Sequence, residues 1–226
     1  PGSFPVNSSK LIKPIPGNLR RIYLYGGCLC PPHKGHLDLI ADKVLELTGP
    51  NDKMIIGLEG DDMRHGFDSK NLITIINKFL ELKKISDKVE VYITGSRNLN
   101  FPHLEVLRLV AKKMNLSYRD LITVIVGEDY TREGKLSSLN ESIEFAEEEN
   151  NIDIETDIMP RPESSILSST NLERLLNDYN EQGKDDAVFD KKLKEFLPSV
   201  FISNPVIYNE IKDLLTKKES FSTLVL

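Results

Sequence analysis

The sequence predicts an α/β protein with a Rossmann-like, doubly wound parallel sheet of about five strands, followed by a C-terminal helical segment. The first observation is that short apolar runs rich in β-forming residues alternate with longer segments whose apolar residues recur at helical spacing. The second is that this alternation stops beyond residue 164, where only helical spacing remains. Strands that are separated by helices pair in parallel and are covered on both faces, which is the doubly wound arrangement.

Each element follows from its own residues. Runs of apolar, β-branched and aromatic residues predict strands at 20–25, 53–58, 89–94, 121–127 and 152–159. A helix is expected to begin near Lys34 and to stop at Gly49-Pro50, and a second is expected to be capped by Ser69. Further helices are predicted at 102–114 and 139–150, and three short helices within 164–216. The apolar residues that define the first two helices are Leu37, Ile40, Val44 and Leu47, then Leu72, Ile75, Ile76, Phe79 and Leu82.

These elements divide the chain into three parts. Residues 1–18 are expected to be a tag remnant and a flexible lead-in, because the first three residues resemble a protease scar and several prolines follow. Residues 19–165 hold the alternating pattern and are predicted to form the Rossmann-like core. Residues 166–226 are predicted to be a helical part that completes the candidate site described below.

Composition limits the expected partners. The formal net charge of −6 gives no basic face for a phosphate backbone, so no nucleic-acid partner is expected. No apolar run approaches the ~20 residues of a membrane span, so no membrane partner is expected either. Cys28 and Cys30 are separated by one residue, a spacing at which a disulfide is strained. We therefore expect reduced thiols and a cytoplasmic protein. The sequence leaves open whether the chain forms a homo-oligomer.

The stretch between the first predicted strand and helix carries the chemistry. Gly26 and Gly27 allow a sharp turn and a close approach of a ligand to the backbone. The helix that follows begins near Lys34, so its unpaired N–H groups and its positive dipole end face the loop. His33 and His36 are three residues apart and lie on the same side of the first turn. The pattern predicts an anion site, with histidine donors that could stabilise charge on a phosphate.

Two other interpretations of this stretch are open. The first is zinc, since Cys28, Cys30, His33 and His36 are four acceptable ligands within one short segment. The spacing is tighter than is usual for zinc ligands, and a dication would sit at the positive end of a helix dipole. The second is a purely structural role, with buried thiols and histidines that cap the helix.

The segment "GGCLCPPHKGHLDLI" resembles the first signature of the HxGH nucleotidyltransferase superfamily, G-G-x-F-x-P-x-H-x-G-H. The matching residues are Gly26, Gly27, Pro31, His33, Gly35 and His36. Leu29 stands where the phenylalanine is usual, and Cys30 where Asp or Asn is common. The position of the segment, after a strand and before a helix, is the context that the signature requires.

The segment "ILSSTNLERLL" resembles the second signature of the same superfamily, I-S-S-T-x-x-R. Ser168, Ser169, Thr170 and Arg174 match it, with one extra residue before the arginine. Hydroxyl groups and helix N–H groups can hold phosphate oxygens, and the arginine adds a permanent charge. The alternative is a capped surface helix with an exposed arginine.

Within the superfamily, the chain is most similar to nicotinamide or nicotinate mononucleotide adenylyltransferases. Their strand-ending G-x-D segment is matched by Gly127 and Asp129. Leu197, Pro198, Val200 and Tyr208 resemble their C-terminal L-P-x-x-V…Y segment, with one residue fewer before the valine. The chain departs from them because it has no tryptophan, and because the basic patch after the second strand is reduced to Arg64 and His65. The "HLDLI" that follows Gly35 resembles the phosphopantetheine adenylyltransferase branch instead.

The resemblance implies an enzyme that transfers a nucleoside monophosphate, AMP from ATP, to the phosphate of a small acceptor and releases pyrophosphate. It implies catalytic roles for His33, His36 and Arg174, and acceptor binding by Gly127, Glu128 and Asp129. The residues that it implies for nucleotide binding are Tyr25, Gly26, Gly27, Lys34, Gly35, Ser168, Ser169 and Thr170. Mg²⁺ is the implied cofactor, held by triphosphate oxygens and water rather than by a protein cage. A cytidylyltransferase, a phosphopantetheine adenylyltransferase-like enzyme, and a degenerate protein that only binds nucleotide are the alternatives.

Overall fold

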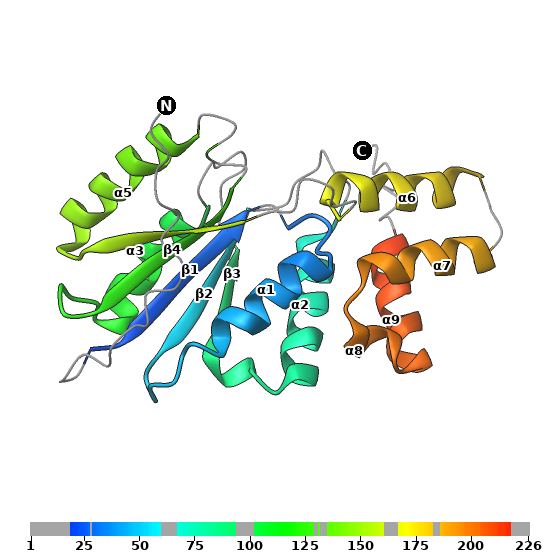
Figure 1. Ribbon diagram of the computed structural model, residues 1–226, viewed down its shortest axis with the longest axis horizontal. Coiled ribbons are helices and arrows are strands. Elements are labelled where there is room, and N and C mark those ends of the chain that lie inside the picture. The colour runs from blue at the N-terminus through cyan, green and yellow to red at the C-terminus, as the bar shows by residue number, and fades with distance from the viewer. Residues whose placement is uncertain are drawn as a thin grey trace, which may run out of the picture.

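The computed structural model describes residues 19–27, 29–59, 67–93, 102–128, 131, 135–160, 167–182 and 186–217. One parallel sheet of five strands lies at the centre of this part of the chain, in the order β3-β2-β1-β4-β5 (Figure 1). The strands are β1 (Arg21–Gly27), β2 (Lys53–Leu58), β3 (Val89–Ile93), β4 (Leu121–Gly127) and β5 (Ile154–Met159). The predicted Rossmann-like α/β fold is confirmed.

The strand order reverses on either side of β1. The chain moves outward from β1 through β2 to β3, then crosses back so that β4 pairs with the opposite edge of β1. At the carboxyl edge Gly27 lies opposite Leu58, and on the other side Gly127 lies opposite Met159. Ligands of such sheets bind beyond the carboxyl ends of the strands, where the order reverses. The carboxyl ends of β1 and β4 therefore define where a site is expected.

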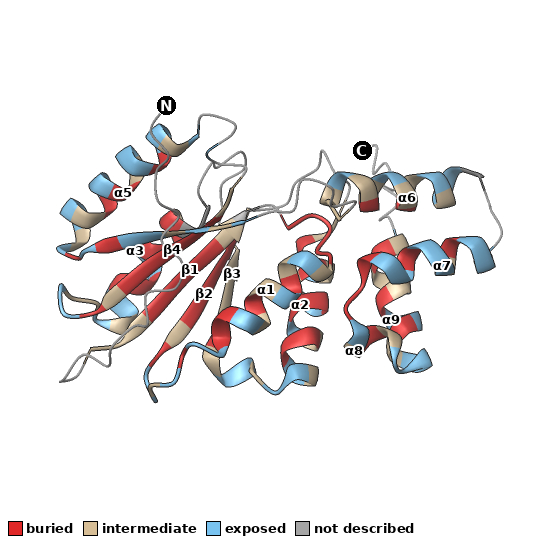
Figure 2. Cartoon of the chain, in the orientation of Figure 1, coloured by how far each residue is buried: buried red, intermediate tan, exposed pale blue. Residues whose placement is uncertain are grey.

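Helices cover both faces of the sheet. Successive residues of the central strands point to opposite faces, so apolar side chains have to be buried on both. Tyr23 and Tyr25 of β1 pack on the face that is covered by α1 (Lys34–Val44) and α2 (Ser69–Lys83). Ile22 and Leu24 pack on the other face, under α3 (Pro102–Met114) and α5 (Leu136–Asn150). Figure 2 shows that β1, β2 and β4 are largely buried, as double coverage requires. A short 3₁₀ turn, η1 (Ser86–Lys88), leads into β3.

The edge strand β5 is less covered by helices, and an ion pair links it to the rest of the protein. Its side chains alternate between buried and exposed only in part, and Ile158 is exposed. Asp157 forms an ion pair with Lys43 of α1, with 2.7 Å between Oδ2 and Nζ. Lys43 is buried and also pairs with Glu46, which accepts a 2.5 Å hydrogen bond from the Tyr23 hydroxyl. The buried Lys43 ammonium therefore has two carboxylate partners, which offset its loss of hydration.

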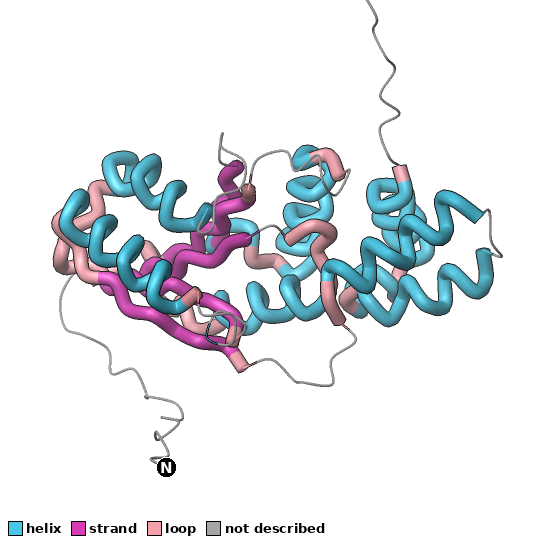
Figure 3. The backbone as a smooth tube through the Cα atoms, turned by 90° about the horizontal axis from the view of Figure 1, so that it is seen from above, coloured by secondary structure: helices cyan, strands magenta, loops and turns pink. Residues whose placement is uncertain are grey.

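The C-terminal part packs against α2, on the side of the molecule where α1 and α2 lie. It consists of α6 (Ser169–Gln182), α7 (Asp186–Phe196), α8 (Ser199–Ile202) and α9 (Pro205–Thr216), which lie together to one side of the sheet (Figure 3). Phe201 meets Phe79 of α2 edge to face, with 6.1 Å between ring centroids. An ion pair of 3.4 Å between Lys78 of α2 and Glu210 of α9 adds to the contact. The C-terminal helices thus share one hydrophobic cluster with α1 and α2.

Several local predictions differ from the structure, among them the helix expected at 139–150, which begins at Leu136 and is labelled α5. The N-cap of α2 is Asp68 and not Ser69, because the Asp68 carboxylate accepts from the Lys70 N–H at 2.8 Å. The first helix was expected to continue to Gly49-Pro50 but ends at Val44, and Leu47 is buried in the segment that follows the helix. The strand expected at 152–159 begins at Ile154. The described part of the tail holds α6, α7, α8 and α9 where three helices were expected, since Pro198 and Pro205 each start a new helix.

None of the described helices is long and apolar enough to cross a membrane.

Candidate functional site

The loop between β1 and α1 is tightly packed. Leu29 through His33 are all buried, although they connect a strand to a helix at the edge of the sheet. Leu29 has a φ of 44°, in the left-handed region that side chains with a Cβ seldom adopt. Its side chain is buried in the cluster that α1, α2 and the C-terminal helices share. Burial of this leucine holds the loop in a conformation that its backbone alone would not favour.

His33 and His36 form a reciprocal capping box at the start of α1. His33 is the N-cap residue, and its Nδ1 accepts a hydrogen bond from the Gly35 N–H at 3.1 Å. The Nδ1 of His36 accepts in turn from the His33 N–H at 3.4 Å. The two rings stack, with centroids 3.8 Å apart and planes 28° apart. The structural alternative is thus correct in one respect, since His33 does cap the helix.

This box also fixes the tautomer of both histidines. A ring nitrogen that accepts a backbone N–H carries no proton, so in each neutral ring the proton is on Nε2. The two imidazoles therefore offer donors of defined direction at a helix N-terminus, where the dipole favours an anion. Capping and phosphate binding use different nitrogen atoms of the same ring and are compatible.

Gly35 has little room for a side chain. A Cβ built on it would lie 3.0 Å from both Cε1 and Nδ1 of His33. The glycine lets its own N–H approach the imidazole closely enough to donate to it. Lys34, beside it at the first helical position, is half-buried.

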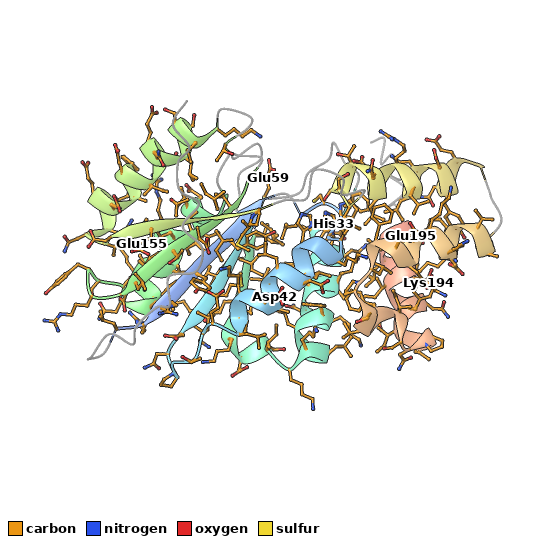
Figure 4. The ribbon with its side chains drawn as sticks, viewed as in Figure 1. His33, Asp42, Glu59, Glu155, Lys194 and Glu195 are labelled. Carbon is orange, nitrogen blue, oxygen red and sulfur yellow. The ribbon has the colours of Figure 1, made fainter. Side chains whose placement is uncertain are left out.

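The first turn of α6 is attached to the same loop. Ser169 donates a hydrogen bond from Oγ to the carbonyl oxygen of Pro31, at 3.0 Å. Ser168 is the residue before the helix, and its hydroxyl accepts from the Asn171 N–H at 3.1 Å. In Figure 1 the start of α6 lies next to the loop that leads into α1, and in Figure 4 His33 lies where the sheet meets the C-terminal helices. Two helix N-termini, far apart in the sequence, are thereby joined at one place.

Thr170 and Arg174 lie on the outer face of α6. Both are exposed, whereas Leu172 and Leu176 on the opposite face are buried. Arg174 follows Thr170 by four residues, so the two side chains are neighbours one turn apart. The extra residue relative to the I-S-S-T-x-x-R pattern moves the arginine around the helix by about 100°, yet keeps it on the side of Thr170. Helical side chains lean toward the N-terminus, which directs Arg174 toward the end of α6 that meets the loop.

The carboxyl ends of β1 and β4 lie side by side. Tyr25, which is buried, pairs in register with Ile125 of β4. The strand was predicted to end at residue 25, but β1 also includes Gly26 and Gly27 as its last two residues. Gly127 ends β4, and the Glu128 N–H continues the ladder by donating to the Met159 carbonyl at 2.9 Å. Thr131 donates to the Glu128 carbonyl from both its N–H and its hydroxyl.

Several predicted residues lie outside the described part of the chain. They are Cys28, Arg64, His65 and Asp129. Tyr208 is described but lies away from the loop, where its hydroxyl donates to Asp190 at 2.8 Å. Among the described residues, no three His, Cys, Asp or Glu side chains are grouped so that they could hold a metal ion. The zinc interpretation depends on Cys28, so it stays open.

Two features of the site could not be foreseen from residue types. One is the capping box, in which His36 takes the place that Glu or Gln usually holds. The other is the Pro31 carbonyl as the acceptor for Ser169, because it is a backbone atom 138 residues away in sequence. The S/T-rich start of α6 was the one available signal that this helix end has a polar partner.

No protein-family model and no curated protein matches the chain. Solved structures do resemble it. Thermotoga maritima TmcAL bound with alpha-thio ATP is 11% identical with a TM-score of 0.53, and the match covers 86% of this chain and 56% of that one. The chain thus spans little more than half of TmcAL, and at this identity the likeness concerns the fold.

Plasmodium falciparum nicotinic acid mononucleotide adenylyltransferase also resembles the chain, and the match covers nearly the whole length of the Plasmodium protein. The complex with APC is 14% identical with a TM-score of 0.46 and covers 85% of this chain and 97% of that one. The complex with NaAD is 14% identical with a TM-score of 0.45, and covers 85% and 98%.

Proposed function

We propose that the chain is a nucleotidyltransferase that transfers AMP from ATP to the phosphate of a small acceptor, nicotinamide or nicotinate mononucleotide, and releases pyrophosphate. The observation that carries the proposal is the hydrogen bond between Ser169 and the Pro31 carbonyl, 3.0 Å long. It joins the two segments that resemble the superfamily signatures, although they are separated by more than half of the chain. We place the triphosphate between these two helix N-termini, beyond β1, where histidine, hydroxyl and cationic side chains offer complementary charge.

The proposed reaction needs no covalent bond to the protein. An oxygen of the acceptor phosphate attacks the α-phosphorus of the triphosphate in line, the bond to the β-phosphate oxygen breaks, and pyrophosphate leaves. The Nε2–H groups of His33 and His36 donate to the triphosphate, with one of them on the α-phosphate where charge builds up. The protein thus contributes position and preorganised donors.

The remaining charge of the triphosphate is assigned to α6 and to Lys34. The helix N-terminus, Ser168 and Thr170 offer N–H and hydroxyl groups to the β- and γ-phosphates, and Arg174 adds a planar fork that can hold two oxygens. The Ser169 hydroxyl is not assigned to a phosphate, because its one proton is already donated to the Pro31 carbonyl. Mg²⁺ enters as part of the substrate, bound to triphosphate oxygens and water.

The acceptor side is assigned to the carboxyl end of β4. Gly127 and Glu128 lie at the carboxyl edge of the sheet, where β4 ends between β1 and β5. A ligand over this edge would donate from its ribose hydroxyls to the Glu128 and Asp129 carboxylates. An acceptor bound there would lie next to a triphosphate that is held by α1 and α6, as direct transfer requires.

The proposal is tested by product analysis. The chain is incubated with Mg²⁺, with ATP or CTP, and with each of a set of phosphorylated acceptors, and the products are identified by mass. A dinucleotide that forms from ATP and a nicotinamide-type mononucleotide is the expected result. Product from CTP and a polyol or choline phosphate would assign the chain to a cytidylyltransferase. If ATP binds but no product forms with any acceptor of the set, the chain is a protein that only binds nucleotide.

A further inference from the structure

A second polar cluster lies at the far end of α6, away from the candidate site. We call it the α6 clamp, and it consists of Tyr179, Asp186, Phe189, Asp190, Tyr208 and Lys212. These residues come from α6, α7 and α9, which lie side by side in both views (Figures 1 and 3). The cluster has no part in the proposed chemistry.

Aromatic contacts join α6 to α7. The rings of Tyr179 and Phe189 stack with centroids 3.9 Å apart and planes 19° apart. The Tyr179 hydroxyl donates to Asp186 Oδ1 at 2.6 Å. Since Phe189 is buried, this stack is anchored in the core of the C-terminal helices.

Lys212 of α9 holds the stack from the third helix. Its Nζ lies 5.5 Å from the centroid of Tyr179 and 5.3 Å from that of Phe189, so one cation faces both rings. The same ammonium forms a 2.8 Å ion pair with Asp190, and Tyr208 donates to the same carboxylate oxygen at 2.8 Å. Asp186 lies 3.6 Å away as a second anion.

The charged form of Lys212 is favoured. Burial lowers its pKa, but the hydrogen bond to Asp190 and the neighbouring negative charges outweigh burial and raise the pKa above its ordinary value. The Asp190 pKa is correspondingly lowered, since the hydrogen bonds from Lys212 and Tyr208 outweigh the opposing effect of burial. With the Lys212 side chain only 16% exposed, solvent screens this pair less than a surface pair.

The clamp acts on the helix that carries the proposed triphosphate ligands. Leu172, Leu176 and Tyr179 lie along one face of α6, and Thr170 and Arg174 lie on the opposite face. Ser169 and Tyr179 are ten residues apart, which is about 15 Å along the helix axis. A tilt of α6 by ~10° about the clamp would move its first turn by about 2–3 Å. Misplacement by ~1 Å can already cost a hundredfold in rate.

We propose that Lys212 is a positioning residue, which sets the axis of α6 through Tyr179 and Phe189 and so places the first turn of α6 against the loop that leads into α1. The proposal rests on the proposed function for its consequence in catalysis. Its structural part, that Lys212 orders α6, holds for any function of the chain.

The test replaces Lys212 by Met, which keeps most of the apolar stem and removes the cation. Lys78→Met is the control, because Lys78 of α2 likewise forms an ion pair between two helices, with Glu210 of α9, but is not part of the α6 clamp. Lys212→Arg restores a cation over the two rings and is the rescue variant. Hydrogen exchange of the α6 amides is measured for all three variants and for the wild type, together with the KM for ATP and for the acceptor.

In Lys212→Met, exchange of the α6 amides should become about tenfold faster or more, because the helix loses an anchor and opens locally. The KM for ATP should rise roughly tenfold while the KM for the acceptor stays within about twofold, since only the triphosphate side moves. Lys78→Met should change neither, and Lys212→Arg should recover most of the loss.

Unchanged α6 exchange in Lys212→Met would overturn the proposal, as would equal effects in Lys78→Met. Faster exchange with an equal rise in both KM values would also overturn it, because the loss would then be general. If the wild type turns over no nucleotide, the proposed function fails, and the exchange measurement alone still decides whether Lys212 orders α6.

Discussion

Replacement of Gly35 by alanine separates the structural role of His33 from its proposed chemical role. The new Cβ would lie 3.0 Å from Cε1 and Nδ1 of the His33 ring. Carbon atoms pack comfortably at about 3.5–4.0 Å, so the imidazole has to move by roughly 0.5 Å. That movement breaks or lengthens the 3.1 Å hydrogen bond by which His33 caps α1.

The effect of Gly35→Ala on stability should be small, because two terms oppose each other. Loss of an N-cap bond costs about 1 kcal/mol. Alanine in place of glycine in a helix gains up to about 1 kcal/mol. The sum stays within about 1 kcal/mol, which for a chain of this size shifts the Tm by no more than about 4 °C.

The effect of Gly35→Ala on turnover should be larger. If His33 donates to the triphosphate, a displacement of half an ångström should lower kcat/KM roughly tenfold, given that ~1 Å can cost a hundredfold. The assay is pyrophosphate release at saturating acceptor, run beside a thermal melt. Asp42→Ala, at an exposed position later in α1, is the control and should be active. Full activity in a folded Gly35→Ala protein would refute the reasoning, and so would a Tm lowered by far more than the balance allows.

Four further results are expected. His36→Ala should keep the fold and lower turnover by at least ~100-fold, the scale for loss of one preorganised donor, and near-normal turnover would remove His36 from the mechanism. Arg174→Lys keeps the charge but loses the fork, so the KM for ATP should rise or kcat fall while the affinity for the acceptor stays near normal; a change confined to the acceptor would place Arg174 on the other side. Elemental analysis should find no zinc bound by Cys28 and Cys30, and one zinc per chain that is lost on double Cys→Ser substitution would contradict this. Asp120 is buried and forms an ion pair with Arg20, with 2.9 Å between Oδ1 and Nε. Burial raises the pKa of Asp120, but hydrogen bonds from Arg20 and from backbone N–H groups outweigh burial and lower the pKa overall. Its stabilising contribution is therefore complete above about pH 4 and is lost as the pH falls further, and Asp120→Asn should flatten the fall in Tm below that pH.

Sequence reasoning predicted most of the fold because the buried strands of a parallel sheet are short, continuous apolar runs, which can be recognised in the sequence. The strand 121–127 and the helix 102–114 were predicted with the bounds that the structure has. Their ends are marked by strong local signals, with Pro102 in the first turn and a glycine at residue 127. Where two residue types compete for one role, local signals do not decide, and Asp68 caps α2 instead of the neighbouring Ser69.

Sequence reasoning proposed the residues of the candidate site but could not give their geometry. Helix periodicity placed His33 and His36 on one turn, and Thr170 and Arg174 on another. It could not show that each histidine accepts a backbone N–H, because that depends on ring orientation. Nor could it bring the two turns together, since the contact runs through a backbone carbonyl and depends on how α6 packs.

Acceptor-dependent release of pyrophosphate tests the central claim most directly. The chain is mixed with ATP and Mg²⁺, and pyrophosphate is measured with and without nicotinamide or nicotinate mononucleotide. Transfer at a site built from α1 and α6 predicts release only when an acceptor is present, one pyrophosphate for each dinucleotide formed, with the signal abolished by Ser169→Tyr, which would wedge α6 away from Pro31. No pyrophosphate from the wild type with any acceptor, or full release by the Ser169→Tyr variant, would contradict the account.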